Sequence, residues 1–198
     1  IRLMENYAAY MALTDYEVGR LIDSLQASGE LDNTLVMYIV GDNGASAEGG
    51  LEGTFSEIAS LIGVQLGLES TLKRIDEIGG PTSEPHVPVG WAWAMNAPFQ
   101  WTKQVASHFG GTRNPMVVHW PRGIKARGKL REQFHHVIDV VPTILEAAKI
   151  PEPKVVNGIP QKPIEGVSMV YSFDDANAKG RRTTQYFELA TNRAIYHD

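Results

Sequence analysis

Cysteine is absent from this 198-residue chain, and so is any excess of positive charge. Without cysteine the chain has no disulfide, no thiolate metal site and no cysteine nucleophile. Its cellular compartment stays open, because exported bacterial proteins also often lack cysteine. The formal net charge of -5 offers no basic surface to nucleic acid. No apolar run is long enough to span a membrane, and the first residues show no signal-peptide pattern.

The remaining composition is that of a globular protein with one good core. Hydrophobic residues make up 43% and charged residues 21% of the chain, both ordinary values. The chain begins at Ile1 inside a helical pattern without an initiator methionine, and it stops at Asp198 directly after a strand-like segment. We therefore expect an internal piece of a longer protein.

Residues 35–44 are the most informative stretch. Their apolar run ends in Gly41 and is followed by Asp42 and Asn43. Such a run predicts a strand buried on both faces of a parallel sheet, and ligands bind beyond the carboxyl ends of such strands. Carboxylate and carboxamide oxygens suit Ca²⁺ or Mg²⁺. A turn that merely ends the strand would use the same residues, so both interpretations stay open.

Hydrophobic periodicity predicts the other elements. An amphipathic helix at 3–28 precedes the strand at 34–41, which together form half of a crossover unit. Further along we expect a candidate helix at 98–108 broken by two glycines, a strand at 116–120, a helix at 139–148, and a hairpin of strands 184–189 and 193–196. In the helix at 139–148, Asp139 is the expected N-cap, and Ile144, Leu145 and Ala148 the expected buried stripe.

Residues 44–100 form a long irregular insertion with short helices expected between 55 and 78. Its end is rich in aromatic residues, among them Trp91, Trp93, Phe99 and Trp101. Insertions of this length are often functional, and aromatic residues often wall a pocket. A hydrophobic cluster that fixes a long loop explains them equally well.

Four blocks of sequence, in this order and spacing, resemble the sulfatase family of the alkaline phosphatase superfamily. They are residues 32–36 running into 41–44, Lys103 with 110–115, residues 119–121 with Gly123 and Ile124, and residues 139–145. The stretches 45–53 and 91–101 look most like bacterial arylsulfatases. The resemblance implies an α/β fold, a mostly parallel sheet sandwiched by helices. Residues 1–150 would be the C-terminal half of the catalytic domain, and 151–198 a linker and the start of a small C-terminal antiparallel sheet.

The resemblance also assigns roles to single residues. Asp42 and Asn43 resemble two ligands of the divalent cation, usually Ca²⁺. Lys103 resembles the catalytic lysine that binds the sulfate oxygens and the leaving oxygen, although most lysines are simply solvated. His108 lies near Lys103 and is a second candidate for substrate binding, although a loop histidine is more often a surface residue.

Other parts of the family pattern are missing from this chain. There is no Cys/Ser-X-Pro-Ser-Arg segment, whose first residue becomes the formylglycine nucleophile, and two aspartate ligands near the family's N-terminus are also absent. We expect a missing N-terminal half as covalent partner, and no activity from this chain alone. The implied function is hydrolysis of small-molecule sulfate esters. A phosphate or phosphonate ester hydrolase and a non-catalytic binding module are the alternatives, and the sequence does not give the oligomeric state.

Overall fold

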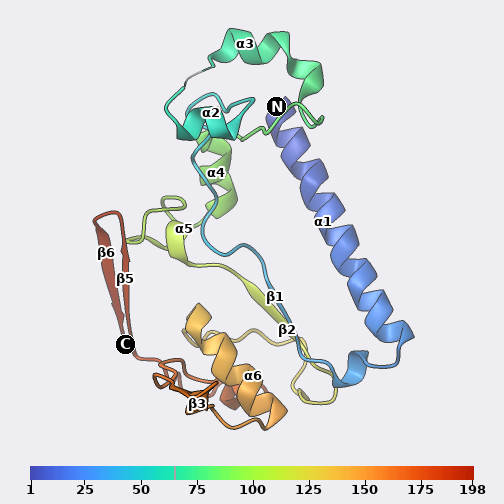
Figure 1. Ribbon diagram of the computed structural model, residues 1–198, viewed down its shortest axis with the longest axis vertical. Helices are drawn as coiled ribbons and strands as arrows, with labels where there is room; N and C mark the ends of the chain where they lie inside the picture. Colours follow the sequence, from blue (N-terminus) through green and yellow to red (C-terminus); the bar gives the residue numbers. More distant parts are fainter. Residues whose placement is uncertain (65) are drawn as a thin grey trace. The chain divides into compact units, whose positions relative to one another are not determined.

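The computed structural model describes residues 1–64 and 66–198, and Figure 1 shows its elements in chain order. The chain divides into two compact units, which are described separately. The first unit comprises Ile1–Ser28, Tyr38–Val117 and Phe187–Ala194, and the second comprises Gly29–Met37, Val118–Tyr186 and Ile195–Asp198. Among the described residues, no helix is long and apolar enough to cross a membrane.

The first unit begins with the long helix α1, Arg2–Ala27, which confirms the predicted helix. The helix is followed by Gly29, whose φ of 75° suits a glycine at the end of a helix. Of its side chains Leu3 is buried, while Tyr10 and Tyr16 are more than half exposed. Only the start of α1 therefore contributes to the core of this unit.

That core lies where the start of α1 meets the insertion. Its buried members are Leu3, Phe55, Ile78 and Val87, with Met4, Tyr7, Leu66 and Met95 packed around them. Backbone bridges hold the insertion together here, since Thr54 pairs with His86 and Ser56 with Glu84. Much of the insertion thus folds against α1.

The insertion carries short helices, as the sequence predicted. They are α2 (Glu57–Leu61), α3 (Leu68–Lys73), the 3-10 helix η2 (Ile75–Glu77) and α4 (Val89–Asn96). Trp93 of α4 meets Trp101 edge to face at 5.9 Å between ring centroids, and Phe99 meets Phe109 at 5.8 Å. These ring contacts agree with the interpretation of the aromatic residues as a cluster that fixes the loop.

The strand that precedes Asp42 differs from the expectation. It is β1, Val36–Ile39, and it pairs with β2, Met116–His119, in a two-stranded sheet. Its side chains are half-buried, and Ile39 is 39% exposed. The burial on both faces predicted for residues 34–41 is not found, since no side chain of β1 is fully buried; within the described residues β1 pairs with β2 alone. The described residues therefore do not show the mostly parallel sheet.

The expected helix at 98–108 is wrong, since these residues form turns. Trp101 and Gln104 have φ values of 68° and 73°, which a right-handed helix does not accept. The two glycines predicted to break a helix lie instead inside the one-turn helix α5, Phe109–Thr112. Most of the backbone bonds of this region close local turns, and one, from the Lys103 N–H to the Ala45 carbonyl, reaches a distant segment.

The second unit is built around α6, Val140–Ala148, which follows the 3-10 helix η3, Val137–Asp139. The predicted helix is confirmed but its buried stripe is wrong: Thr143 is fully buried and Ile144 is 47% exposed. Asp139 lies at the N-cap without a side-chain bond to α6. Its carboxylate accepts bonds from the backbone N–H groups of His136 and Val167 and from Arg182.

Short strands and one more 3-10 helix complete the chain. They are β3 (Val155–Val156), antiparallel to β4 (Ile159–Pro160), η4 (Val170–Ser172), β5 (Thr184–Leu189) and β6 (Asn192–His197). The strands β5 and β6 pair with one another, which confirms the predicted hairpin. Its turn residues Ala190 and Thr191 both have positive φ, 46° and 72°, as tight hairpin turns require.

Candidate functional site

Asp42 and Asn43 directly follow β1, beyond Gly41 with its φ of 80°. Asp42 is exposed and Asn43 half-buried. Across residues 1–64 and 66–198, no hydrogen bond or ion pair engages the Asp42 carboxylate. The side-chain amide of Asn114 bonds to the backbone of Asn43 when its oxygen and nitrogen are exchanged. The amide nitrogen then donates to the Asn43 carbonyl at 2.9 Å, and the amide oxygen accepts from the Asn43 N–H at 3.2 Å. The loop is thus anchored while the Asp42 oxygens stay available.

Lys103 comes from the turns after α4 but lies against the loop that follows Asn43. Its backbone N–H donates to the carbonyl of Ala45 at 3.0 Å. Its ammonium lies 2.8 Å from Oε2 of Glu48, and its side chain is 34% exposed. A merely solvated lysine would have no such partner across a gap of 55 residues. The fold therefore places this lysine beside the segment of the candidate metal ligands, while its role stays a prediction.

The Glu48 carboxylate is the common hydrogen-bond acceptor of the side chains around Lys103, although the sequence did not predict a role for it. Its carboxylate accepts hydrogen bonds from Lys103, from the Ser46 hydroxyl at 2.6 Å and from the Gln104 amide at 2.8 Å. The hydrogen bond from Lys103 lowers the pKa of Glu48 below its usual value, aided by Ser46, while burial opposes that shift. Glu48 is therefore an ionised anchor for Lys103 at neutral pH.

His108 is exposed and belongs to a different set of contacts. Its Nδ1 lies 2.9 Å from the Ser107 hydroxyl, and its ring centroid lies 5.8 Å from that of Trp101. The described contacts do not join His108 to Lys103. Its place in substrate binding remains a prediction from the resemblance.

Glycines let two distant loops approach each other at this site. The N–H of Gly44 donates to the carbonyl of Gly111 at 3.1 Å. A Cβ added to Gly44 would lie 1.6 Å from the Gly110 carbonyl oxygen, and one added to Gly110 would lie 2.0 Å from that of Trp101. Asn96 adds a side-chain link, because its Oδ1 accepts from the Ala45 N–H at 3.0 Å. The loop after Asn43 and the loop around Lys103 are therefore joined backbone to backbone.

We expect Gly44→Ala to lower the free energy of unfolding by about 2–3 kcal/mol, the usual scale of overpacking. Gly19→Ala is the matched control, because an added Cβ there meets nothing within 4 Å and lies in the exposed face of α1. That control should raise stability by about 0.5–1 kcal/mol, as Ala replaces Gly in a helix. Urea unfolding of both variants measures the difference, and equal stabilities would contradict the close approach.

The comparison with known protein families decides the membership of this chain. The model of the family described as Sulfatase matches residues 1–150. The chain belongs to the sulfatase family. Membership in this family implies an alkaline phosphatase-like α/β fold.

Two known proteins are similar in sequence to this sulfatase-family chain. It is 35% identical over 152 residues to an uncharacterized sulfatase of Schizosaccharomyces pombe, a match that covers 77% of this chain and 26% of the relative. It is 30% identical over 168 residues to an arylsulfatase of Klebsiella aerogenes, covering 85% of this chain and 34% of that enzyme. The chain thus spans between a quarter and about a third of these relatives.

Proposed function

We propose that this chain is part of an arylsulfatase-type sulfuric ester hydrolase that cleaves small-molecule sulfate esters. The observation that carries the proposal is the position of Lys103, whose segment is bonded to Ala45, two residues after Asn43. Similarity to an arylsulfatase over 85% of the chain supports the same substrate class. In this proposal residues 1–150 belong to the catalytic domain, and residues 151–198 form a linker and the start of a small C-terminal subdomain.

Asp42 and Asn43 are the residues that would hold a divalent cation, Ca²⁺ or Mg²⁺. Their oxygens are the ligand type that these hard cations prefer, and the Asp42 carboxylate is exposed. Asn43 is a neutral ligand, which limits negative charge around an anionic ester. A bound cation supplies Lewis acidity. Because Ca²⁺ takes about 6–8 oxygen ligands, the remaining ligands would come from the rest of the parent protein.

Lys103 would bind the sulfate oxygens and the leaving oxygen through charge-assisted hydrogen bonds, which strengthen as charge develops on these atoms. Glu48 keeps the ammonium in place. His108 would add a substrate contact. The formylglycine nucleophile would come from the parent protein, since no residue segment of this chain matches its motif. The chain alone should therefore not turn over an aryl sulfate.

Calorimetric titration of this chain with Ca²⁺ tests the metal ligands. We expect weak binding, with a dissociation constant of about 10⁻⁴–10⁻³ M, as for sites with few charged ligands. Asp42→Ala should weaken that binding at least about tenfold. Asp15→Ala, which removes an exposed carboxylate of α1, should leave it unchanged. A micromolar Ca²⁺ site that survives Asp42→Ala would mean that Asp42 and Asn43 only end the strand.

A further inference from the structure

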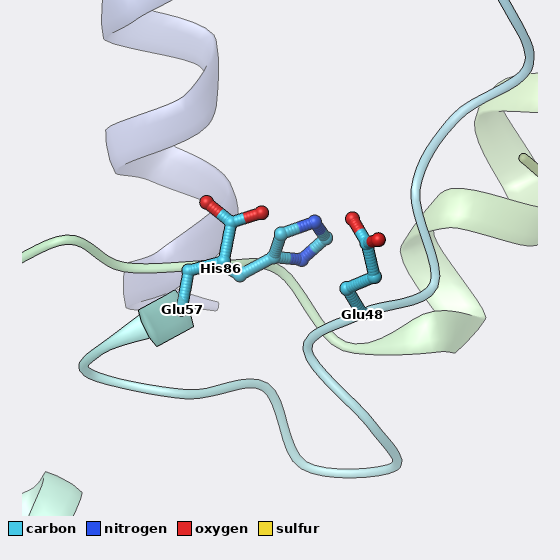
Figure 2. A group of neighbouring side chains, drawn as sticks. All are labelled: Glu48, Glu57 and His86. Carbon is cyan, nitrogen blue, oxygen red and sulfur yellow. The ribbon is translucent and has the colours of Figure 1, made fainter. Parts of the chain in front are cut away.

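A second cluster of metal-binding side chains lies within the first unit. It consists of Glu48, Glu57 and His86, and one donor atom of each lies within 4.8 Å of the donor atoms of the other two. Figure 2 shows the imidazole of His86 between the two carboxylates. The three residues come from the loop after Asn43, the first position of α2 and the segment that pairs with Thr54. All three are half-buried.

The imidazole of His86 is oriented as a ligand. Its Nδ1 lies 2.9 Å from the carbonyl oxygen of Val87. A carbonyl oxygen only accepts hydrogen bonds, so Nδ1 carries the proton and Nε2 has a free lone pair. Metal-bound histidines usually donate their other ring N–H to such a carbonyl, which fixes the ring. Gly49 packs closely behind the ring, because an added Cβ would lie 2.8 Å from Nδ1.

The two carboxylates can serve a cation without losing their present contacts. Oε2 of Glu48 accepts from Lys103 and Ser46, while Oε1 accepts from Gln104 only and keeps a lone pair. In the part of the chain that the structure describes, the Glu57 carboxylate has no hydrogen bond or ion pair. The Lys103 ammonium balances the negative charge of Glu48. The negative charge of Glu57 is left for a cation.

We propose that Glu48, Glu57 and His86 bind a divalent transition metal of the Zn²⁺ class. An imidazole ligand favours Zn²⁺ over Ca²⁺, whose ligands are oxygen atoms. Three protein ligands leave one position of a tetrahedral ion open to water or an anion. The site shares no residue with Asp42 and Asn43, and Glu48 connects it to Lys103.

Titration of this chain with Zn²⁺ in the presence of excess Ca²⁺ tests the proposal. We expect one Zn²⁺ to bind. His86→Ala and the isosteric Glu57→Gln should each weaken binding at least about tenfold, because even outer-shell partners of a metal change affinity by roughly 10–100-fold. The matched control is His119→Ala, which removes an exposed histidine of β2 and should leave Zn²⁺ affinity unchanged.

Nuclear magnetic resonance of the imidazole groups provides a second readout that does not depend on a variant. Zn²⁺ should shift the His86 resonances and leave those of His119 in place. Unchanged Zn²⁺ affinity in His86→Ala, or unshifted His86 resonances at saturating Zn²⁺, would overturn the proposal. Asp42→Ala separates the two sites: it should weaken Ca²⁺ binding at least about tenfold while Zn²⁺ binding persists. Loss of Zn²⁺ binding in Asp42→Ala would also overturn a separate site.

Discussion

Replacing Lys103 with methionine should lower the turnover of an aryl sulfate by about 10²–10³-fold in the full-length enzyme that contains this chain. Methionine keeps an unbranched stem of similar length and removes the charge. The expected loss is that of one well-placed donor to a developing negative charge, about 2.7–4 kcal/mol. Because that charge is largest in the transition state, kcat should fall more than KM rises.

Steady-state kinetics of the variant measures this loss. Lys73→Met is the matched control, because Lys73 lies on α3 in an exposed ion pair with Glu69 and should leave turnover unchanged. Ca²⁺ binding by Lys103→Met should persist, which separates the lysine from the metal ligands. If turnover stays within about threefold of wild type, well under one tenfold step of 1.4 kcal/mol, Lys103 is a structural partner of Glu48 and not a catalytic residue.

Replacing Arg182 with methionine should lower the free energy of unfolding by about 3–5 kcal/mol, the cost of leaving a buried charge without its partner. The guanidinium of Arg182 donates to both carboxylate oxygens of Asp139. Asp139 has no exposed surface, and Arg182 is 9% exposed. Burial raises the pKa of Asp139, but hydrogen bonds from Arg182, Val167 and His136 outweigh that effect and hold the pKa below its usual value.

Urea unfolding across pH measures this loss and its cause. Since folding depresses the pKa of Asp139, its stabilising contribution is present above the usual pKa of 3.8 and is lost as the pH falls through the lower folded value. The difference between wild type and Arg182→Met should therefore shrink below about pH 4. Arg193→Met, which breaks an exposed pair with Glu188, should cost about 0–1 kcal/mol. Equal losses in the two variants would contradict a buried pair.

The sequence predicts the elements whose hydrophobic pattern is local. The helix α1, the strand β2 and the hairpin of β5 and β6 all appear close to their expected bounds. The expected helix at 98–108 fails because Trp101 and Gln104 take positive φ in a series of turns from which the Lys103 N–H bonds to distant Ala45. Asp139 is the N-cap of α6 as expected, but its carboxylate pairs with Arg182, which lies 43 residues away and which no local pattern predicts.

In the candidate site too, the sequence predicts only the residues that carry a local signal. Asp42 and Asn43 stand out because two oxygen-bearing residues follow an apolar run, and Lys103 because it matches a family motif. Glu48 has no such signal, as its three donors converge only in the folded chain. Glu57 and His86 lie in unrelated segments, and no spacing joins them to Glu48, so only the structure brings this cluster together.

The backbone contact between Gly44 and Gly111 has a consequence for how this protein can diversify. It closes a loop of more than sixty residues, and the bond from the Lys103 N–H to the Ala45 carbonyl lies close to the two ends of that loop. Lengthening such a loop costs little, about 0.6 kcal/mol for each doubling. A change in the length of the segment between α2 and α3 should therefore cost little stability and leave the backbone bond between Lys103 and Ala45 in place.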